Sequence, residues 1–217
     1  MTRSSSAKIL REYGPFPGGD HVHGVTFDGH DVWFAAGAKL KAFDPASGEV
    51  VRSIDVAAHA GTAFDGRYFY QLADDRIQKI DPKTGSVLAT IPAPGGGGDS
   101  GLAWAEGMLW VGHYRERKIH QIDPESGAIL RTIESNRFVT GVTWVDGELW
   151  HGTWEGDESE LRHVDPQTGE VLETIEMPRG TGVSGLESDG GDRFFCGGGS
   201  SGKVRAVRRR YPARRSR

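Results

Sequence analysis

The stretch Asp165-Pro166-Gln167-Thr168-Gly169 decides the fold, because its pattern D-P-x-[ST]-G recurs at 44–48, 81–85 and 123–127. Each copy lies between an apolar run and a run rich in β-branched residues. The proline fixes φ at the second position of a turn, and the glycine adopts the positive φ that the turn requires. Each copy therefore predicts a β-hairpin, and the recurrence predicts a repeat protein.

A second repeated element precedes each turn and consists of a glycine, a short apolar segment and a glycine-containing turn. Five glycines open these segments about 40 residues apart: Gly24, Gly61, Gly101, Gly141 and Gly185. That spacing is the length of one four-stranded propeller blade, and no segment has helical periodicity. The sequence predicts an all-β protein, a five-bladed β-propeller of four-stranded blades.

The fifth unit lacks an outer strand, since after 203–207 the chain runs into an arginine-rich end without another D-P turn. The segment Ile9-Leu10-Arg11-Glu12-Tyr13 has the pattern of the outer strands in the other units, such as 171–175. We expect this N-terminal strand to close the ring by pairing into blade five. The expected organisation is a disordered N-terminus at 1–6, a single β-propeller domain at 7–208 and a basic C-terminal tail at 209–217.

Composition limits the class of protein further. No apolar run approaches the roughly 20 residues of a membrane span, so we expect no membrane segment. The first residues lack the apolar core of a secretory signal, which favours a cytoplasmic protein. Cys196 is the single cysteine, which excludes an internal disulfide and a cysteine cluster for zinc. The net charge is −4, and we interpret the arginine-rich end as a solvated terminus rather than a nucleic-acid-binding tail.

Aromatic residues recur at one position of the second strand of each unit. They are Trp33, Phe69, Trp110, Trp150 and Phe194. Because the repeat period accounts for them, we interpret them as packing between blades rather than as a surface for stacking a substrate.

The residues just before the leading glycines differ from blade to blade, unlike the rest of the repeat. In a propeller these positions ring the mouth of the central channel, where varied side chains are typical of binding. With the loops on the same face they give the candidate ligand-binding residues Ser100, His113, Tyr114, Arg115, Thr140, Trp154 and Ser184. The expected partner is a small molecule or a peptide.

Several histidines fall in the same row. His21, His23, His59 and His113 could hold a divalent metal ion such as zinc, with water or substrate in an open position. The alternative is that these side chains hydrogen-bond to their neighbours or to a polar ligand. The remaining histidines lie at other places in the repeat, and we interpret them as structural: His30, His120, His151 and His163.

Glu187 differs from its equivalents in the other units, which are Thr26, Ala63, Ala103 and Thr143. If this position points inward, a carboxylate lies in the channel and could act as a general base or a ligand. If it points outward, Glu187 is a solvated or blade-interface acid. Glu187, Asp99 and His59 are the candidate catalytic residues.

The repeats resemble the five-bladed propeller of the bacterial and plant-type glutaminyl cyclases, which convert N-terminal glutamine into pyroglutamate. The similarity covers most of the chain and rests on 161–169, on 144–150 with the later Trp154, and on Ser184-Gly185-Leu186. Virginiamycin lyase-like and lactonase-like propellers carry similar D-P-x-[ST]-G repeats. The resemblance implies the fold and a site at the channel mouth.

The motifs of the cyclase active site are changed in this chain. His21-Val22-His23-Gly24 stands where cyclases have F-T-Q-G, and Ala60 stands where their catalytic Glu precedes glycine. Thr140 and Ser184 occupy positions where the family often has Asn. Cyclisation needs a group that shuttles the amine proton, which Ala60 cannot do.

The sequence thus leads to a small-molecule-binding propeller with a histidine-rich site at the channel mouth, acting as a metal-assisted lyase or hydrolase. The alternatives are a non-catalytic binding or scaffold propeller and a divergent glutaminyl-peptide cyclotransferase.

Overall fold

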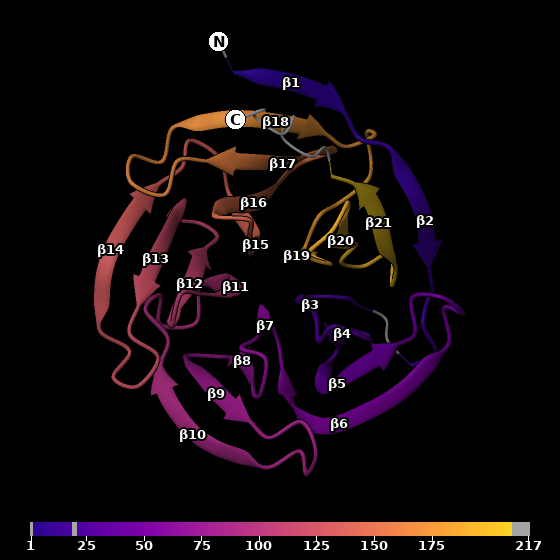
Figure 1. Ribbon diagram of the computed structural model, residues 1–217, viewed down its shortest axis with the longest axis vertical. Coiled ribbons are helices and arrows are strands. Elements are labelled where there is room, and N and C mark those ends of the chain that lie inside the picture. The colour runs from indigo at the N-terminus through magenta and orange to yellow at the C-terminus, as the bar shows by residue number, and fades with distance from the viewer. Residues whose placement is uncertain (1, 19–20, 210–217) are drawn as a thin grey trace, which may run out of the picture.

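The computed structural model describes residues 2–18 and 21–209 and contains β-strands without a helix in that part of the chain. The strands form five sheets arranged in a ring, each radiating outward like a blade (Figure 1). The predicted all-β five-bladed propeller is therefore confirmed. Among the residues described, no helical segment has the length and hydropathy that a membrane crossing needs.

In blades one to four, consecutive strands pair antiparallel from the centre of the ring to its rim. Blade one consists of β3 (Val25–Phe27), β4 (Val32–Ala35), β5 (Gly37–Phe43) and β6 (Val50–Ala58). Blade two consists of β7 (Thr62–Phe64), β8 (Phe69–Ala73), β9 (Arg76–Ile80) and β10 (Val87–Pro92). Blade three consists of β11 (Asp99–Ala105), β12 (Met108–His113), β13 (Lys118–Ile122) and β14 (Ile129–Glu134). Blade four consists of β15 (Val139–Val145), β16 (Glu148–Glu155), β17 (Glu158–Val164) and β18 (Val171–Glu176).

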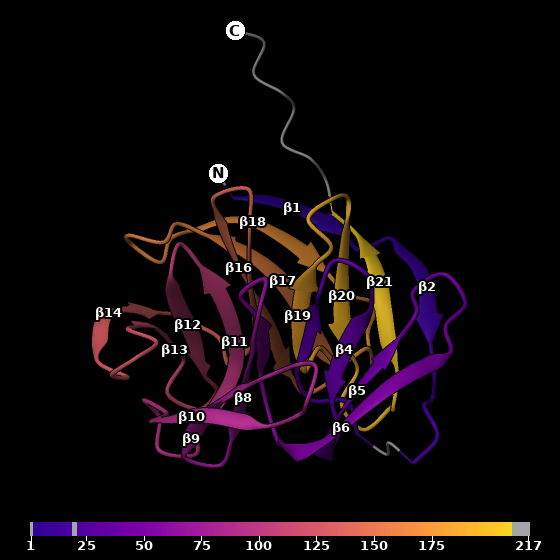
Figure 2. The same cartoon turned by 60° about the horizontal axis from the view of Figure 1, so that its bottom comes forward.

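Blade five joins the two ends of the chain. Its inner strands are β19 (Gly185–Ser188), β20 (Arg193–Gly197) and β21 (Val204–Arg208), and its outer strand is β2 (Ile9–Tyr13). β2 pairs antiparallel with β21, with Tyr13 opposite Val204, and lies outside it in both views (Figures 1 and 2). The predicted closure by the N-terminal strand is confirmed.

Within the segment 1–6, which we expect from the sequence to be disordered, Arg3–Ser6 form β1. β1 pairs parallel with the outer edge of β18, where Ser4 Oγ donates to Glu176 Oε1 at 2.6 Å. Blade five lacks a D-P turn. A D-P turn packs on the outer strand of the preceding blade elsewhere in the ring, but no such turn follows β18. β1 instead covers its edge and satisfies its backbone groups.

The D-P turns and the outer strands hold neighbouring blades together. Arg52 of β6 donates to the carbonyl of Pro82 in the turn of blade two at 2.7 Å. Arg131 of β14 makes the same contact with Pro166 in the turn of blade four at 2.9 Å. Arg11 of β2 donates to three carbonyls of the blade-one turn, from Pro45, Ala46 and Ser47. The turns thus contribute to cohesion between blades as well as to the hairpins.

The leading glycines form the wall of the central channel. A Cβ atom at Gly24 would meet the backbone of Gly61, and one at Gly61 would meet Gly101. The contacts continue through Gly141 and Gly185 and return to Gly24, so the five inner strands touch in a closed cycle. Side chains at these positions would collide with backbone, which explains why the repeat keeps glycine there.

The core consists of five apolar clusters, each between two successive blades. Trp33 packs on Phe69 with ring centroids 4.8 Å apart, and Trp150 packs on Phe194 at 5.0 Å. This confirms packing between blades for these pairs. The register differs by one residue from the predicted column in two blades. The counterpart of Trp33 is Tyr70 rather than Phe69 in blade two, and Phe195 rather than Phe194 in blade five.

We expect from the sequence that the propeller ends at residue 208, and the next residue, Arg209, also contacts it. Arg209 is buried and forms ion pairs with Asp146 at 2.7 Å and Glu148 at 3.1 Å, which ties the end of β21 to blade four. Arg209 therefore belongs to the propeller. The rest of the expected tail, 210–217, lies outside the described residues.

Candidate functional site at the channel mouth

A pocket of about 310 Å³ opens at one end of the channel. Every blade contributes to its wall, from the row before the leading glycines and from neighbouring loops. The lining residues are His23, His59, Ala60, Asp99, Ser100, Tyr114, Thr140, Trp154 and Ser184. The structure therefore brings together most of the candidate residues, whereas His21, His113, Arg115 and Glu187 lie outside this lining.

The hydroxyl groups before the leading glycines mainly bridge the blades. Ser100 Oγ donates to the carbonyl of Val139 at 2.8 Å, and Ser184 Oγ donates to that of Val22 at 2.5 Å. Each bond joins one blade to the next around the ring. Thr140 Oγ1 is buried against Gly152 and has no hydrogen-bond partner in the described part of the chain. Ser100 and Ser184 thus line the pocket, but their hydroxyls already form hydrogen bonds between blades.

His59 is the pocket residue best placed to accept a proton. Its Nδ1 lies 2.9 Å from Oδ1 of Asp74, in the loop between β8 and β9, and its side chain is 43% exposed. A carboxylate at Nδ1 fixes the imidazole tautomer and orientation, which leaves Nε2 as the nitrogen for a bound molecule. Sequence reasoning did not include Asp74. Its loop joins a second to a third strand and so lies on the mouth face, which is the signal that could have identified it.

His21 and His23 lie beside each other, with parallel rings whose centroids are 5.7 Å apart. Burial lowers the pKa of His23, and the nearby His21 and His59 lower it further. His23 is therefore neutral near pH 7 and can accept or donate a hydrogen bond at the pocket wall.

His113 and Asp99 face each other across β11 and β12 beneath a glycine-rich loop. The backbone N–H of Gly95 donates to both carboxylate oxygens of Asp99 at 3.0 Å, and a Cβ at Gly98 would collide with the ring of His113. Burial raises the pKa of Asp99. This pair supports the loop, and His113 does not line the mouth pocket. Within residues 2–18 and 21–209, no group of three or more His, Cys, Asp or Glu side chains has an arrangement that could hold a metal ion.

Glu187 points inward and ties three inner strands together. Its Oε1 accepts from Thr143 Oγ1 of blade four at 2.5 Å, and its Oε2 accepts from Thr26 Oγ1 of blade one at 2.9 Å. Burial raises the pKa of Glu187 to about 7, although these hydrogen bonds oppose the shift. Of the two orientations considered, the inward one is correct, and the carboxylate lies further along the inner strand than the mouth pocket.

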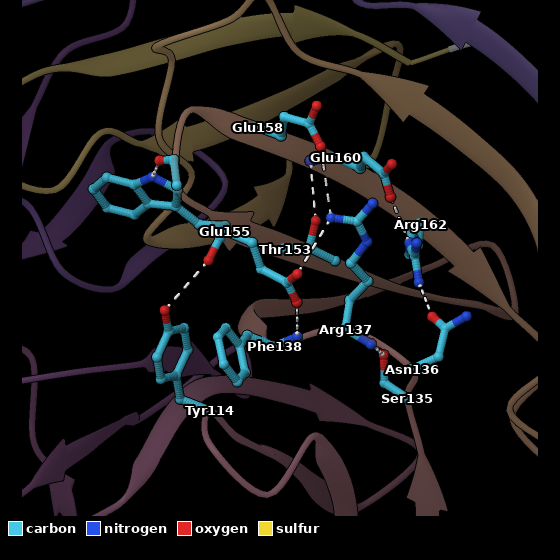
Figure 3. Close-up of polar contacts among 12 residues, drawn as sticks. Tyr114, Ser135, Asn136, Arg137, Phe138, Thr153, Glu155, Glu158, Glu160 and Arg162 are labelled. Carbon is cyan, nitrogen blue, oxygen red and sulfur yellow. Dashed lines mark hydrogen bonds and ion pairs between the residues drawn. The ribbon is translucent and has the colours of Figure 1, made fainter.

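The aromatic side of the pocket is held by polar contacts between blades three and four (Figure 3). Tyr114 Oη donates to the carbonyl of Trp154 at 3.3 Å, and the Tyr114 ring packs on Phe138 at 4.7 Å. Glu155 Oε1 accepts from the backbone N–H of Phe138 at 2.8 Å. Glu155 also forms an ion pair with Arg137 at 3.3 Å. These contacts fix the positions of Tyr114 and Trp154.

The Trp154 indole packs over glycines from blade five. Cβ atoms at Gly182 or Gly199 would collide with the ring, at 2.5 and 2.7 Å. Its Nε1 donates to the carbonyl of Gly156 at 3.1 Å, which anchors the polar edge. The neighbouring candidate Arg115 is exposed and lies away from the pocket.

The fold and the pocket define a five-bladed β-propeller with a concave site at its channel mouth. The chain belongs to the family described as outer membrane protein assembly factor BamB, which matches residues 73–211, more than half of the chain. No curated protein sequence matches it.

Comparison with solved structures shows the fold. Glutaminyl cyclase from Myxococcus xanthus has a TM-score of 0.79 and 19% identity, and the match covers 96% of this chain and 98% of the cyclase. A chain of the mitotic checkpoint complex has a TM-score of 0.54 and 14% identity over 85% of this chain and 60% of that one. Hydrazine synthase from Kuenenia stuttgartiensis has a TM-score of 0.52 and 17% identity over 80% of this chain and 54% of its own. The resemblance to the cyclase propeller is thus confirmed for the fold.

Proposed function

We propose that the channel-mouth pocket binds a small organic molecule. The observation that carries this proposal is that all five blades place side chains in one pocket of about 310 Å³, at the repeat positions where the blades differ. A volume of this size lies at the lower end of the range for small-molecule sites.

The chemistry of the lining indicates how such a molecule would be held. The rings of Tyr114 and Trp154 offer flat apolar surface, and their positions are fixed by contacts between blades. His59, oriented by Asp74, offers a nitrogen that accepts a proton or hydrogen bond from the ligand. The expected ligand has a flat or apolar part and a polar group that donates toward His59.

A reaction at this site would begin with proton removal by His59. Glutaminyl cyclase shares the fold at 19% identity, and Ala60 stands where the resemblance places the catalytic Glu of that family. His59 is the adjacent residue and has its own carboxylate partner. A lyase, a hydrolase and a divergent cyclotransferase all need such a proton acceptor.

Thermal shift measurements with a library of small organic molecules, including a glutaminyl peptide, test the binding proposal. A ligand present at 100 times its Kd should stabilise the protein by about 2.7 kcal/mol. We expect His59→Ala and Tyr114→Ala to abolish the shift, and Arg115→Ala to preserve it because Arg115 does not line the pocket. A shift in His59→Ala and Tyr114→Ala as large as that of the native protein would contradict the proposal.

Two further experiments distinguish between the possible reactions. Release of ammonia from the glutaminyl peptide that requires His59 would favour the cyclotransferase. Addition of zinc tests metal assistance, which predicts a zinc-dependent shift that is lost when His21 and His23 are both replaced by Ala. Asp74→Asn should slow any reaction more than it weakens binding, because Asp74 acts through the imidazole.

A non-catalytic scaffold is a second candidate, favoured by aliphatic side chains exposed on the rim. They occupy the first two positions of the outer strands: Val50, Val51, Val87, Leu88, Ile129, Leu130 and Leu172. Exposed apolar patches are typical of interaction surfaces, and the family is described as an assembly factor. Light scattering tests this candidate, since Leu88→Ser with Leu130→Ser should reduce concentration-dependent association.

A further inference from the structure

The hairpin formed by β16 and β17 extends past the inner strand of its own blade. β15 pairs with β16 as far as Val139 opposite Thr153, and β16 then continues through Trp154 and Glu155, which pair with β17. Blade three has no such extension, because β12 ends at the residue that faces the first residue of β11. Trp154 therefore lines the mouth pocket from a part of the hairpin that lies beyond its ladder with β15.

The side chain of Glu155 connects this extension to the segment that leads into β15. Its Oε1 accepts from the backbone N–H of Phe138, the residue just before β15, at 2.8 Å. Its Oε2 lies 3.3 Å from the guanidinium of Arg137 (Figure 3). A hydrogen bond from a backbone N–H to a carboxylate is charge-assisted and is stronger than one between neutral groups. Glu155 thus holds the start of β15 at the point where the backbone ladder ends.

The contacts of Glu155 lead back to its own neighbour in the chain. The Phe138 ring packs on the Tyr114 ring, with centroids 4.7 Å apart. Tyr114 Oη donates to the carbonyl of Trp154 at 3.3 Å, and Trp154 precedes Glu155 in β16. Tyr114 and Trp154 line the pocket, whereas Glu155 and Phe138 lie behind them. Loss of the Glu155 carboxylate would therefore release the support behind both aromatic rings.

We propose that Glu155 is a positioning residue for the mouth pocket. It acts through Phe138 and Tyr114, and by setting the place of the aromatic rings it determines the preference of the pocket for a ligand with a flat part. This inference rests on the proposed function for its ligand. The placement of the rings, however, is measurable in the protein without one.

Fluorine NMR of the protein labelled with 3-fluorotyrosine tests the placement, and Tyr114→Phe identifies the resonance of Tyr114. We expect Glu155→Ala to shift this resonance, and Glu155→Gln to restore it because the amide oxygen also accepts from the Phe138 N–H. Glu158→Ala is the matched control, since it removes a carboxylate that faces the same Arg137 at 3.8 Å from the other strand of the hairpin. It should leave the resonance in place. Retention of the fold is reported by the resonances of Tyr13, Tyr68 and Tyr70, which should not move.

Two spectral results would overturn the positioning role of Glu155. One is a Tyr114 resonance that is unchanged in Glu155→Ala. The other is an equal shift in Glu155→Ala and Glu158→Ala, which would assign the effect to Arg137 rather than to the hydrogen bond with Phe138.

Binding of two matched amides tests the preference for a flat ligand. Benzamide and cyclohexanecarboxamide carry the same amide group on a flat ring and on a puckered ring of similar size. The native protein, Glu155→Gln and Glu158→Ala should bind benzamide about tenfold more tightly than the other amide, and Glu155→Ala should lose this preference. A preference retained in Glu155→Ala would overturn the proposal. Failure of both amides to bind the native protein would count against the proposed function, whereas the fluorine spectra decide the positioning role by themselves.

Discussion

The Glu187 carboxylate accepts a hydrogen bond from the Thr143 hydroxyl at 2.5 Å, which ties the inner strand of blade five to that of blade four. Its other oxygen accepts from Thr26 of blade one. One acidic side chain thus joins three of the five inner strands beside the point where the ring closes.

This relationship predicts a pH dependence of stability. Burial raises the pKa of Glu187 to about 7 from an ordinary 4.5. Below pH 4.5 the acid is protonated in both states, and above that pH the unfolded chain releases its proton first, so stability falls as pH rises toward 7. In Glu187→Gln this loss, about 3 kcal/mol from the size of the shift, should be absent. Denaturant unfolding of the native protein and of Glu187→Gln from pH 4.5 to 8 measures this loss. The same pH dependence of stability in both proteins would contradict the role of Glu187.

The packing of the D-P turns predicts different costs for two glycines with the same backbone conformation. Gly169 has φ +76°, and a Cβ there would lie 2.9 Å from the carbonyl oxygen of Glu134 in blade three. Gly147 has φ +78° and open space around it. Gly147→Ala should cost about 1 kcal/mol from backbone strain alone, and Gly169→Ala about 1–3 kcal/mol more from the clash. Equal melting temperatures would refute the role of this turn between blades.

Ring closure predicts a graded response to N-terminal truncation. Removal of 1–7 takes away β1 and uncovers the edge of β18, whereas removal of 1–13 also deletes β2 and the buried Tyr13. The shorter deletion should lower the melting temperature by a few degrees. The longer one should lower it sharply, because it opens blade five. Calorimetry of the two truncated proteins checks this order, and full stability after removal of 1–13 would disprove closure by β2.

Two adjacent arginines should differ in their contribution to stability. Arg209 is buried between Asp146 and Glu148, whereas Arg208 pairs with Asp192 at the surface. Arg209→Ala should lose about 3 kcal/mol because it leaves a partly buried carboxylate without its partner. Arg208→Ala should lose less than about 1 kcal/mol. Chemical denaturation measures the stability that each variant loses. Similar losses would contradict a special contribution of the buried Arg209.

Much of the fold could be predicted from the sequence because the same local sequence pattern, with the same conformational preference, occurs in several units. Asp165 and Gly169 specify a turn without help from distant residues. The four copies of that turn each predict one hairpin. The pattern shared by 9–13 and the outer strands indicated the closing strand, since each outer strand buries its fifth residue, which is Tyr13 in β2 and Ile175 in β18.

The candidate site was predicted less completely. The row before the leading glycines could be located, because the connectivity of a propeller sorts its loops by face. Which of these side chains are free to meet a ligand could not be predicted. Ser100 and Ser184 turn out to bridge blades, and His113 lies beneath a glycine loop. Asp74 reaches His59 from a loop that carries no repeated signal.

The sequence by itself determined the number of blades, their strand order and the closure at blade five, because turn geometry and strand periodicity are local properties. Only the tertiary structure decided that Glu187 points into the ring, that Asp74 lies beside His59 and that β1 pairs with the edge of β18. Those features depend on contacts between residues far apart in the chain. Their geometry is set by how five blades pack around one axis, which no single repeat contains.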